Sequence, residues 1–227
     1  LAAFRFANRA MALQRVRSVY ALKRRRGEDP DLGELEKSER PSWRPFQLAF
    51  LLLSIPSLAD PMHADRVQPM EAHAELLWFP TGGGKAEAYL GVAAFTMAIR
   101  RLQGKLGGYD GSRGLAVIMR YTLRLLTLQQ FQRATALICA MEMLRREALA
   151  NGDTSLGHEP FTIGLWVGNR VTPGTTEDSH RAIEDIRNPG RHQAGATSPV
   201  QLTSCPWCGS DVAPGRDVDV DKDRGRT

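Results

Sequence analysis

A glycine run that ends in a lysine, at residues 80–85 (Pro-Thr-Gly-Gly-Gly-Lys), constrains this chain more than any other feature. The apolar run 76–79 precedes it, and a helical pattern follows from about Ala86 to Leu102. A strand, a glycine turn and a helix in this order are the context that a phosphate-binding loop requires. Glycines let backbone N–H groups approach an anion, and the helix start adds the positive end of its dipole. A glycine-rich turn with a chance lysine is the alternative, which this order of elements disfavours.

The loop predicts a nucleoside-triphosphate site with ATP and Mg²⁺ as its ligands. Lys85 is the candidate catalytic residue, because its ammonium would contact the β- and γ-phosphates. Ala86 stands where the usual pattern has a Ser or Thr hydroxyl on Mg²⁺, and a methyl group cannot coordinate a metal. We therefore expect ATP binding with poor hydrolysis, and a turnover rate that Ala86→Thr changes. The expected nucleotide-binding residues are Thr81, Gly82, Gly83, Gly84, Lys85 and Ala86.

Apolar runs and helical patterns alternate along the middle of the chain. The runs 76–79, 115–119 and 161–167 are predicted strands, and the longest helical pattern covers 125–150. This alternation predicts an α/β fold with a parallel sheet flanked by helices. The expected regions are a basic helical N-terminal extension at 1–58, with a second helix at 46–55, the P-loop domain at 59–188, and an irregular tail at 189–227.

The charge is unevenly spread, although 30 Lys and Arg against 25 Asp and Glu give a net charge of only +5. Residues 1–27 hold eight basic and no acidic residues, with apolar residues near helical spacing. This predicts an amphipathic helix whose basic face either attracts a nucleic-acid backbone or is simply solvated. The most apolar stretch, 46–58, is broken by Pro56 and is shorter than the roughly 20 residues of a membrane span. We expect no membrane contact, a cytoplasmic location, and, because the first residue is Leu1, a piece of a longer chain.

Five blocks together resemble the N-terminal part of the large superfamily 2 helicase of DISARM-type phage-defence systems. They are 43–50 (Trp-Arg-Pro-Phe-Gln-Leu-Ala-Phe), 77–85, 119–127 (Met-Arg-Tyr-Thr-Leu-Arg-Leu-Leu-Thr), 129–133 and 164–168. The resemblance implies the first RecA-like P-loop domain, incomplete here, of an ATP-dependent DNA helicase or translocase. DNA and other defence-system subunits are the implied partners.

The same resemblance places Thr122, Arg124 and Gln129 in a motif that contacts the nucleic-acid strand. From the residues alone, Thr122 is equally well a helix cap and Arg124 a solvated side chain. Gln47 is a candidate adenine-reading residue, although its long separation from Lys85 favours a packing role.

Hydrolysis by this class needs an acidic pair after an apolar strand, and the sequence shows none. Glu184-Asp185 lies in a polar, helical-looking stretch. We interpret the chain as a motor fragment that is inactive alone. The alternative is a catalytically inert nucleic-acid-binding or assembly subunit with a degenerate P-loop. A small-molecule phosphotransferase is a third reading, against which the basic helix and the block 119–127 argue.

Cys205 and Cys208 form a C-x-x-C-G turn, which is half of a structural zinc site. Such a site needs four ligands, and neither His180 nor His192 has convincing spacing. Cys139 lies within a predicted helix, where a buried apolar role is more usual. We therefore expect the second ligand pair beyond residue 227, if Zn²⁺ binds at all.

Overall fold

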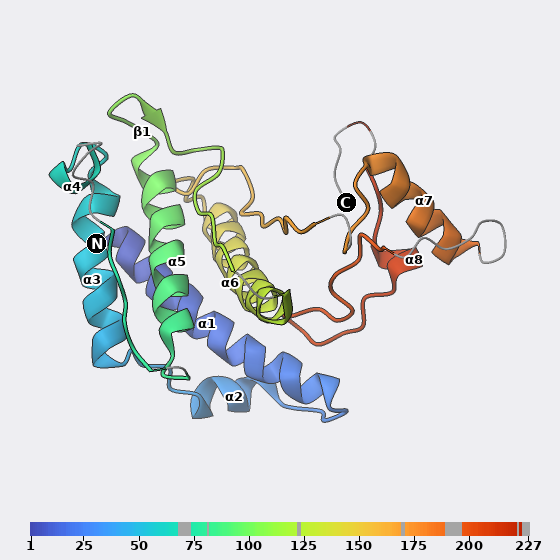
Figure 1. The fold of residues 1–227 in the computed structure, drawn as a ribbon. Coiled ribbons are helices and arrows are strands. Elements are labelled where there is room, and N and C mark those ends of the chain that lie inside the picture. Colours follow the sequence, from blue (N-terminus) through green and yellow to red (C-terminus); the bar gives the residue numbers. More distant parts are fainter. Residues whose placement is uncertain are drawn as a thin grey trace. The chain divides into compact units, whose positions relative to one another are not determined.

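The computed structural model describes residues 1–67, 74–80, 82–121, 124–168, 171–188, 197–221 and 223 (Figure 1). Two compact units divide the chain: unit 1 is Leu1–Ser18 with Asp31–Ile163, and unit 2 is Val19–Pro30 with Gly164–Thr227. The elements in chain order are α1 Ala2–Arg25, α2 Leu32–Ser38, α3 Pro45–Ala59, α4 Ala64–Val67, α5 Lys85–Gln103, β1 Lys105–Leu106, β2 Tyr109–Asp110, α6 Arg124–Ala150, α7 Thr176–Arg187 and α8 Pro214–Asp217.

The predicted α/β fold, a partial RecA-like P-loop domain with a parallel sheet, is wrong. In the described part of the chain the one sheet is antiparallel and two-stranded, with Lys105 opposite Asp110 and Leu106 opposite Tyr109. The runs 76–79, 115–119 and 161–167 are not assigned as strands. A short apolar run looks the same in sequence whether or not a neighbouring strand is present to accept its backbone hydrogen bonds. The fold of the described residues is therefore mostly helical.

The long predicted helices are confirmed, as α1, α5 and α6. Two smaller elements differ from the prediction. Helix α2 lies in the segment expected to be a linker, and the Asp31 carboxylate caps it by accepting from Glu34 N–H at 2.7 Å. Helix α3 continues past Pro56 to Ala59. Because α3 packs along α5, we attribute this to tertiary packing that outweighs the local cost of a helical proline.

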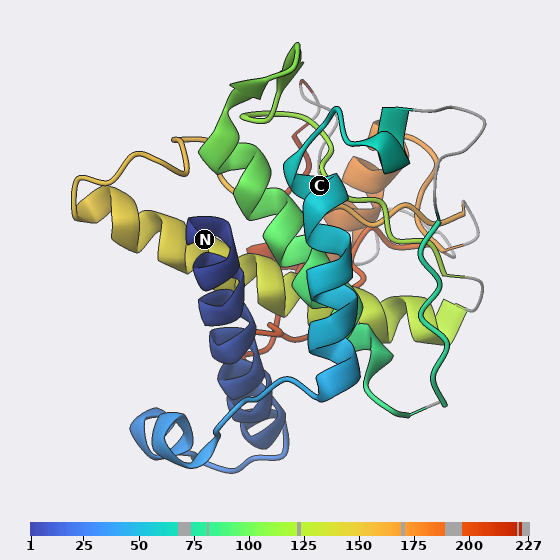
Figure 2. The ribbon, with the colours of Figure 1, turned by 90° about the vertical axis from the view of Figure 1, so that its left-hand side faces the viewer.

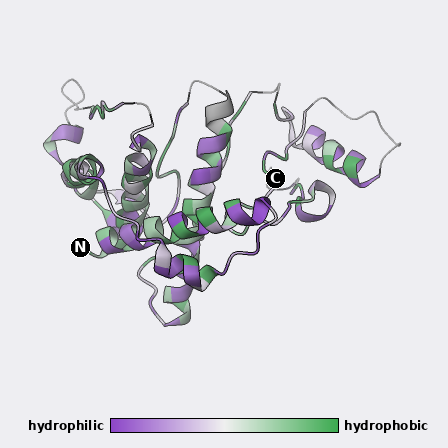
Figure 3. Cartoon of the chain, turned by 90° about the horizontal axis from the view of Figure 1, so that it is seen from below, coloured by the Kyte–Doolittle hydropathy of each residue, from purple (hydrophilic) through white to green (hydrophobic). Residues whose placement is uncertain are grey.

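The core of unit 1 lies between its helices. Helix α3 packs beside α5, and α5 beside α6 (Figures 1 and 2). Figure 3 shows both hydrophobic and hydrophilic residues on the helices of the chain, whereas α3 contains no charged residue. Many of the buried residues are small, which allows close helix packing. Fully buried examples are Ala10 of α1, Leu51 of α3, Ala88, Leu90, Ala94 and Ala98 of α5, and Leu137, Ala140 and Met141 of α6.

A buried ionic network ties α6 to the segment that follows it. Glu142 accepts from Arg145 at 2.6 and 2.8 Å, from Arg146 at 2.8 Å and from Phe161 N–H at 3.0 Å. Arg145 also donates to the carbonyls of Gly157 and His158, each at 3.1 Å. Burial alone raises the pKa of Glu142, but the hydrogen bonds from both arginines and from the Phe161 amide lower it to about 2. The carboxylate is therefore ionised at neutral pH and fixes residues 157–161 against α6.

Unit 2 contains α7 and α8, which pack together. Thr175 caps α7 by accepting from Asp178 N–H at 3.1 Å. Arg187, in the last turn of α7, donates to the carbonyls of Gly215 and Val218. Across the described residues of both units, no helix is long and apolar enough to cross a membrane.

Candidate functional site

The glycine loop opens directly onto the first turn of α5. Gly84 precedes the helix with φ 94° and Lys85 is its first residue, so the backbone turns sharply into the helix at this junction. Gly84, as the N-cap residue, has no side chain to accept from the N–H groups of the first turn. Free amides and the positive end of a helix dipole together attract anions.

Two glycines of the loop have little space for a side chain, and one of them also needs a left-handed backbone conformation. A Cβ on Gly83 would lie 2.5 Å from the Phe79 ring, and one on Gly84 would lie 2.8 Å from Gln47 Nε2. Gly84 also has a left-handed φ that other L-residues rarely adopt. The loop is therefore packed closely against Phe79 and Gln47, and side chains at Gly83 and Gly84 would clash with these residues.

Lys85 is half-buried and folds back over the loop. Its ammonium donates to the carbonyl of Phe79, and to that of Pro80 at 3.3 Å. Within the described residues no carboxylate lies within ion-pair distance of it. Its charge therefore faces uncharged oxygens, an arrangement that a phosphate could displace.

The N-terminal turn of α3 contacts the glycine loop through hydrogen bonds and an aromatic contact. Arg44 donates to Gly83 O and Gln47 to Gly84 O, both at 2.8 Å, and Gln47 Oε1 accepts from Arg44 N–H at 2.8 Å. Phe46 stacks on Phe79 with ring centroids 3.9 Å apart. Gln47 is buried and both ends of its amide have protein partners, which supports the packing role over adenine reading. Sequence reasoning missed Arg44, although an Arg three residues before a Gln at a helix start resembles a capping pattern.

The structure describes only some of the other residues that the sequence predicted for the site. Thr81 and Thr122 lie outside the described residues. Ala86 is the second residue of α5 and presents only its methyl group. Arg124 begins α6, and Gln129 is exposed on the same helix. The structure therefore brings together 82–86, while the predicted nucleic-acid contacts remain a prediction.

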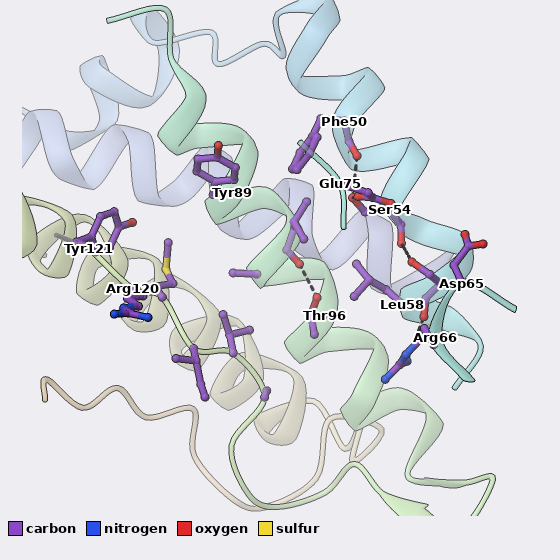
Figure 4. Close-up of a pocket in the computed structure, with 17 residues that line it drawn as sticks. Phe50, Ser54, Leu58, Asp65, Arg66, Glu75, Tyr89, Thr96, Arg120 and Tyr121 are labelled. Carbon is purple, nitrogen blue, oxygen red and sulfur yellow. Dashed lines mark hydrogen bonds between the residues drawn. The ribbon is translucent and has the colours of Figure 1, made fainter. Parts of the chain in front are cut away.

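A cavity of about 670 Å³ lies one helical turn beyond the loop (Figure 4). Its walls come from α3, α4, α5, Glu75 and the extended segment 116–121. They include the aromatic residues Phe50, Tyr89 and Tyr121 beside the charged residues Asp65 and Arg66. The Ser54 hydroxyl lies 2.5 Å from a Glu75 carboxylate oxygen at its edge. Burial raises the pKa of Tyr121, so its hydroxyl is neutral at physiological pH.

The two tail cysteines form a tight turn in unit 2. Gly209 N–H donates to Cys205 O at 2.9 Å, and Cys205 N–H to Ser210 O at 2.8 Å. Neither cysteine forms a disulfide. No cluster of three or more His, Cys, Asp and Glu suited to a metal occurs among the described residues. His180 lies in α7 and His192 is outside the described range, so zinc binding remains a prediction.

Much of the basic charge of α1 is neutralised by acids. Its ion pairs are Arg9–Glu147 at 3.0 Å, Arg15–Glu39 at 3.2 Å, Lys23–Glu28 at 3.6 Å and Arg24–Asp29 at 2.8 Å. Arg25 and Arg26 are exposed, and no ion pair involves them in the described part of the chain. This pattern favours a mostly solvated basic face over a continuous nucleic-acid-binding face.

Comparison with known proteins gives one informative relative. Over 209 residues, 92% of this chain, the sequence is 36% identical to the DISARM protein DrmA of Bacillus paralicheniformis. The matched part makes up 18% of that protein's length. No protein-family model matches the chain. The chain is thus related to a DISARM protein over nearly all of its length. This confirms the defence-system part of the prediction, while the superfamily 2 helicase class stays a prediction.

Proposed function

We propose that this chain binds a nucleoside triphosphate through its glycine loop, as part of a DISARM-type phage-defence protein. In the whole protein, ATP turnover would drive a nucleic-acid helicase or translocase. The observation that carries the proposal is the junction at Gly84 and Lys85, where a left-handed glycine, the N-terminal end of α5 and an ammonium without a described carboxylate partner converge. The relationship to a DISARM protein supports the defence role.

The residues at the loop suit a triphosphate better than they suit Mg²⁺. Positive charge and free N–H groups meet at the start of α5, where phosphate oxygens would replace the carbonyls that now bind Lys85. Ala86 offers no oxygen to a metal. We therefore expect binding of ATP with a weak contribution from Mg²⁺, and little hydrolysis by this chain alone.

Equilibrium binding of labelled ATP tests the proposal. Lys85→Ala should raise the dissociation constant by about 10-fold or more, because a charge-assisted contact contributes roughly 1.5–3 kcal/mol. Lys105→Ala is the matched control, since Lys105 is an exposed lysine of β1. Equal affinity in the Lys85 variant, the Lys105 variant and the unmodified chain would show that the loop does not bind the nucleotide.

A nucleic-acid-binding or assembly module is the second candidate. Arg25 and Arg26 at the end of α1 favour it, because both are exposed and form no ion pair with a described residue. Its test is the salt dependence of affinity for a DNA duplex. Binding through phosphates should weaken steeply between low and physiological salt, and replacing both arginines with alanine should reduce the slope by about 2.

A further inference from the structure

A carboxylate lies at the same end of α5 as the glycine loop. Glu87 belongs to the first turn of the helix, two positions after Lys85. A Cβ built on Gly84 would lie 3.5 Å from Glu87 Oε2, so the carboxylate stands beside the turn that leads into the helix. An acid in the first turn stabilises a helix through its dipole, but a triphosphate bound at this turn would be repelled by it.

Arg133 of α6 neutralises this carboxylate. Its Nη2 donates to Glu87 Oε1, and the ion pair joins α5 to α6 where the two helices pack together. Both side chains are 37% exposed, so water screens the pair only in part. Arg133 ends the block 129–133, in which only Gln129 had a predicted role.

The described charges around the loop favour a polyanion as long as this ion pair is present. Lys85 and Arg44 both donate to backbone carbonyls, which are uncharged. No carboxylate among the described residues forms an ion pair with either of them. Glu87 is the acid of the first turn, and its pairing with Arg133 leaves the other two cations unopposed. Without Arg133, the charge of Glu87 would offset one of them.

We propose that Arg133 is a positioning residue for the triphosphate. Its ion pair holds the Glu87 carboxylate and cancels its charge, so that the start of α5 accepts a polyphosphate. This inference rests on the proposed nucleotide binding and adds to it a residue 46 positions along the chain from Glu87. The alternative is an ion pair that only ties α5 to α6. In that case loss of either partner weakens binding alike, whereas in our proposal only the loss of Arg133 does.

Equilibrium binding of labelled ATP to a set of variants separates the two cases. Arg133→Gln should raise the dissociation constant on the order of 10-fold, because the ligand then meets an unpaired carboxylate. Glu87→Gln should bind at least as tightly as the native chain, and the double variant should recover to within about threefold of native. Arg133→Lys keeps the charge and should retain most of the affinity. The loss in Arg133→Gln should be smaller for ADP than for ATP, since the repulsion grows with the charge of the ligand.

Arg9→Gln is the matched control, because Arg9 forms an exposed ion pair with Glu147 in the last turn of α6. It should leave the dissociation constant unchanged. If Glu87→Gln weakens binding as much as Arg133→Gln does, or if the double variant does not recover, the ion pair is only structural and the inference is overturned. Native affinity in Arg133→Gln also overturns it, while a loss in Lys85→Ala would still support the nucleotide site. Equal affinity with and without Lys85 refutes the proposed function itself, and this inference falls with it.

Discussion

Replacing Glu142 with glutamine removes the charge at the centre of the α6 network. The side chain of Glu142 is 12% exposed and that of Arg145 is 6% exposed, so solvent screens this pair weakly. Lowering the pKa of the carboxyl from 4.5 to about 2 corresponds to about 3 kcal/mol of stabilisation at neutral pH. Glutamine keeps the shape but leaves Arg145 without its counter-charge. We expect a loss of about 3 kcal/mol.

The pH dependence distinguishes an ionic from a steric effect. Because the folded pKa is depressed, the stabilisation is fully present above about pH 4.5 and is lost as the pH falls towards 2. The gap between the native chain and Glu142→Gln should therefore shrink by about half by pH 3. Urea unfolding followed by circular dichroism at pH 7 and pH 3 measures it. Glu147→Gln is the control, since Glu147 forms an exposed ion pair with Arg9 and should cost less than about 1 kcal/mol. A gap that stays constant with pH would refute the reasoning.

Three further changes have definite expected outcomes. Gly84→Ala should weaken ATP binding in the labelled-nucleotide assay and lower the melting temperature, because its φ is left-handed and its Cβ would approach Gln47. Asp31→Ala should cost about 1 kcal/mol in urea unfolding, through loss of the α2 cap. If Cys205 and Cys208 bind zinc, atomic absorption should find the metal in the purified chain and less of it after Cys205→Ser.

Local patterns predicted the helices of this chain well. The apolar spacing and the absence of proline in 86–102 and 125–150 correspond to α5 and α6 almost to the residue. Where the prediction failed, tertiary contacts or caps decided the outcome. Packing on α5 carries α3 past Pro56, and the Asp31 side chain starts α2 in a stretch that composition assigned to a linker.

The predicted strands failed for a non-local reason. Residues 115–119 have the composition of a buried strand, yet a strand exists only when a neighbour accepts its backbone hydrogen bonds. No described segment of this chain does so, and Ile118 remains in water. The apolar composition of 115–119 is typical of a buried strand, but it does not specify which other segment would pair with it.

The glycine loop was predictable because its requirements are local. A turn into α5 with a left-handed residue at Gly84 can be met only by glycine at little cost, and the lysine that follows is placed by the helix itself. The support from Arg44 and Gln47 was not predictable, because it depends on α3 meeting a loop 37 residues further along. The loop geometry within this chain therefore rests on contacts from the start of α3, which sequence patterns around the loop do not specify.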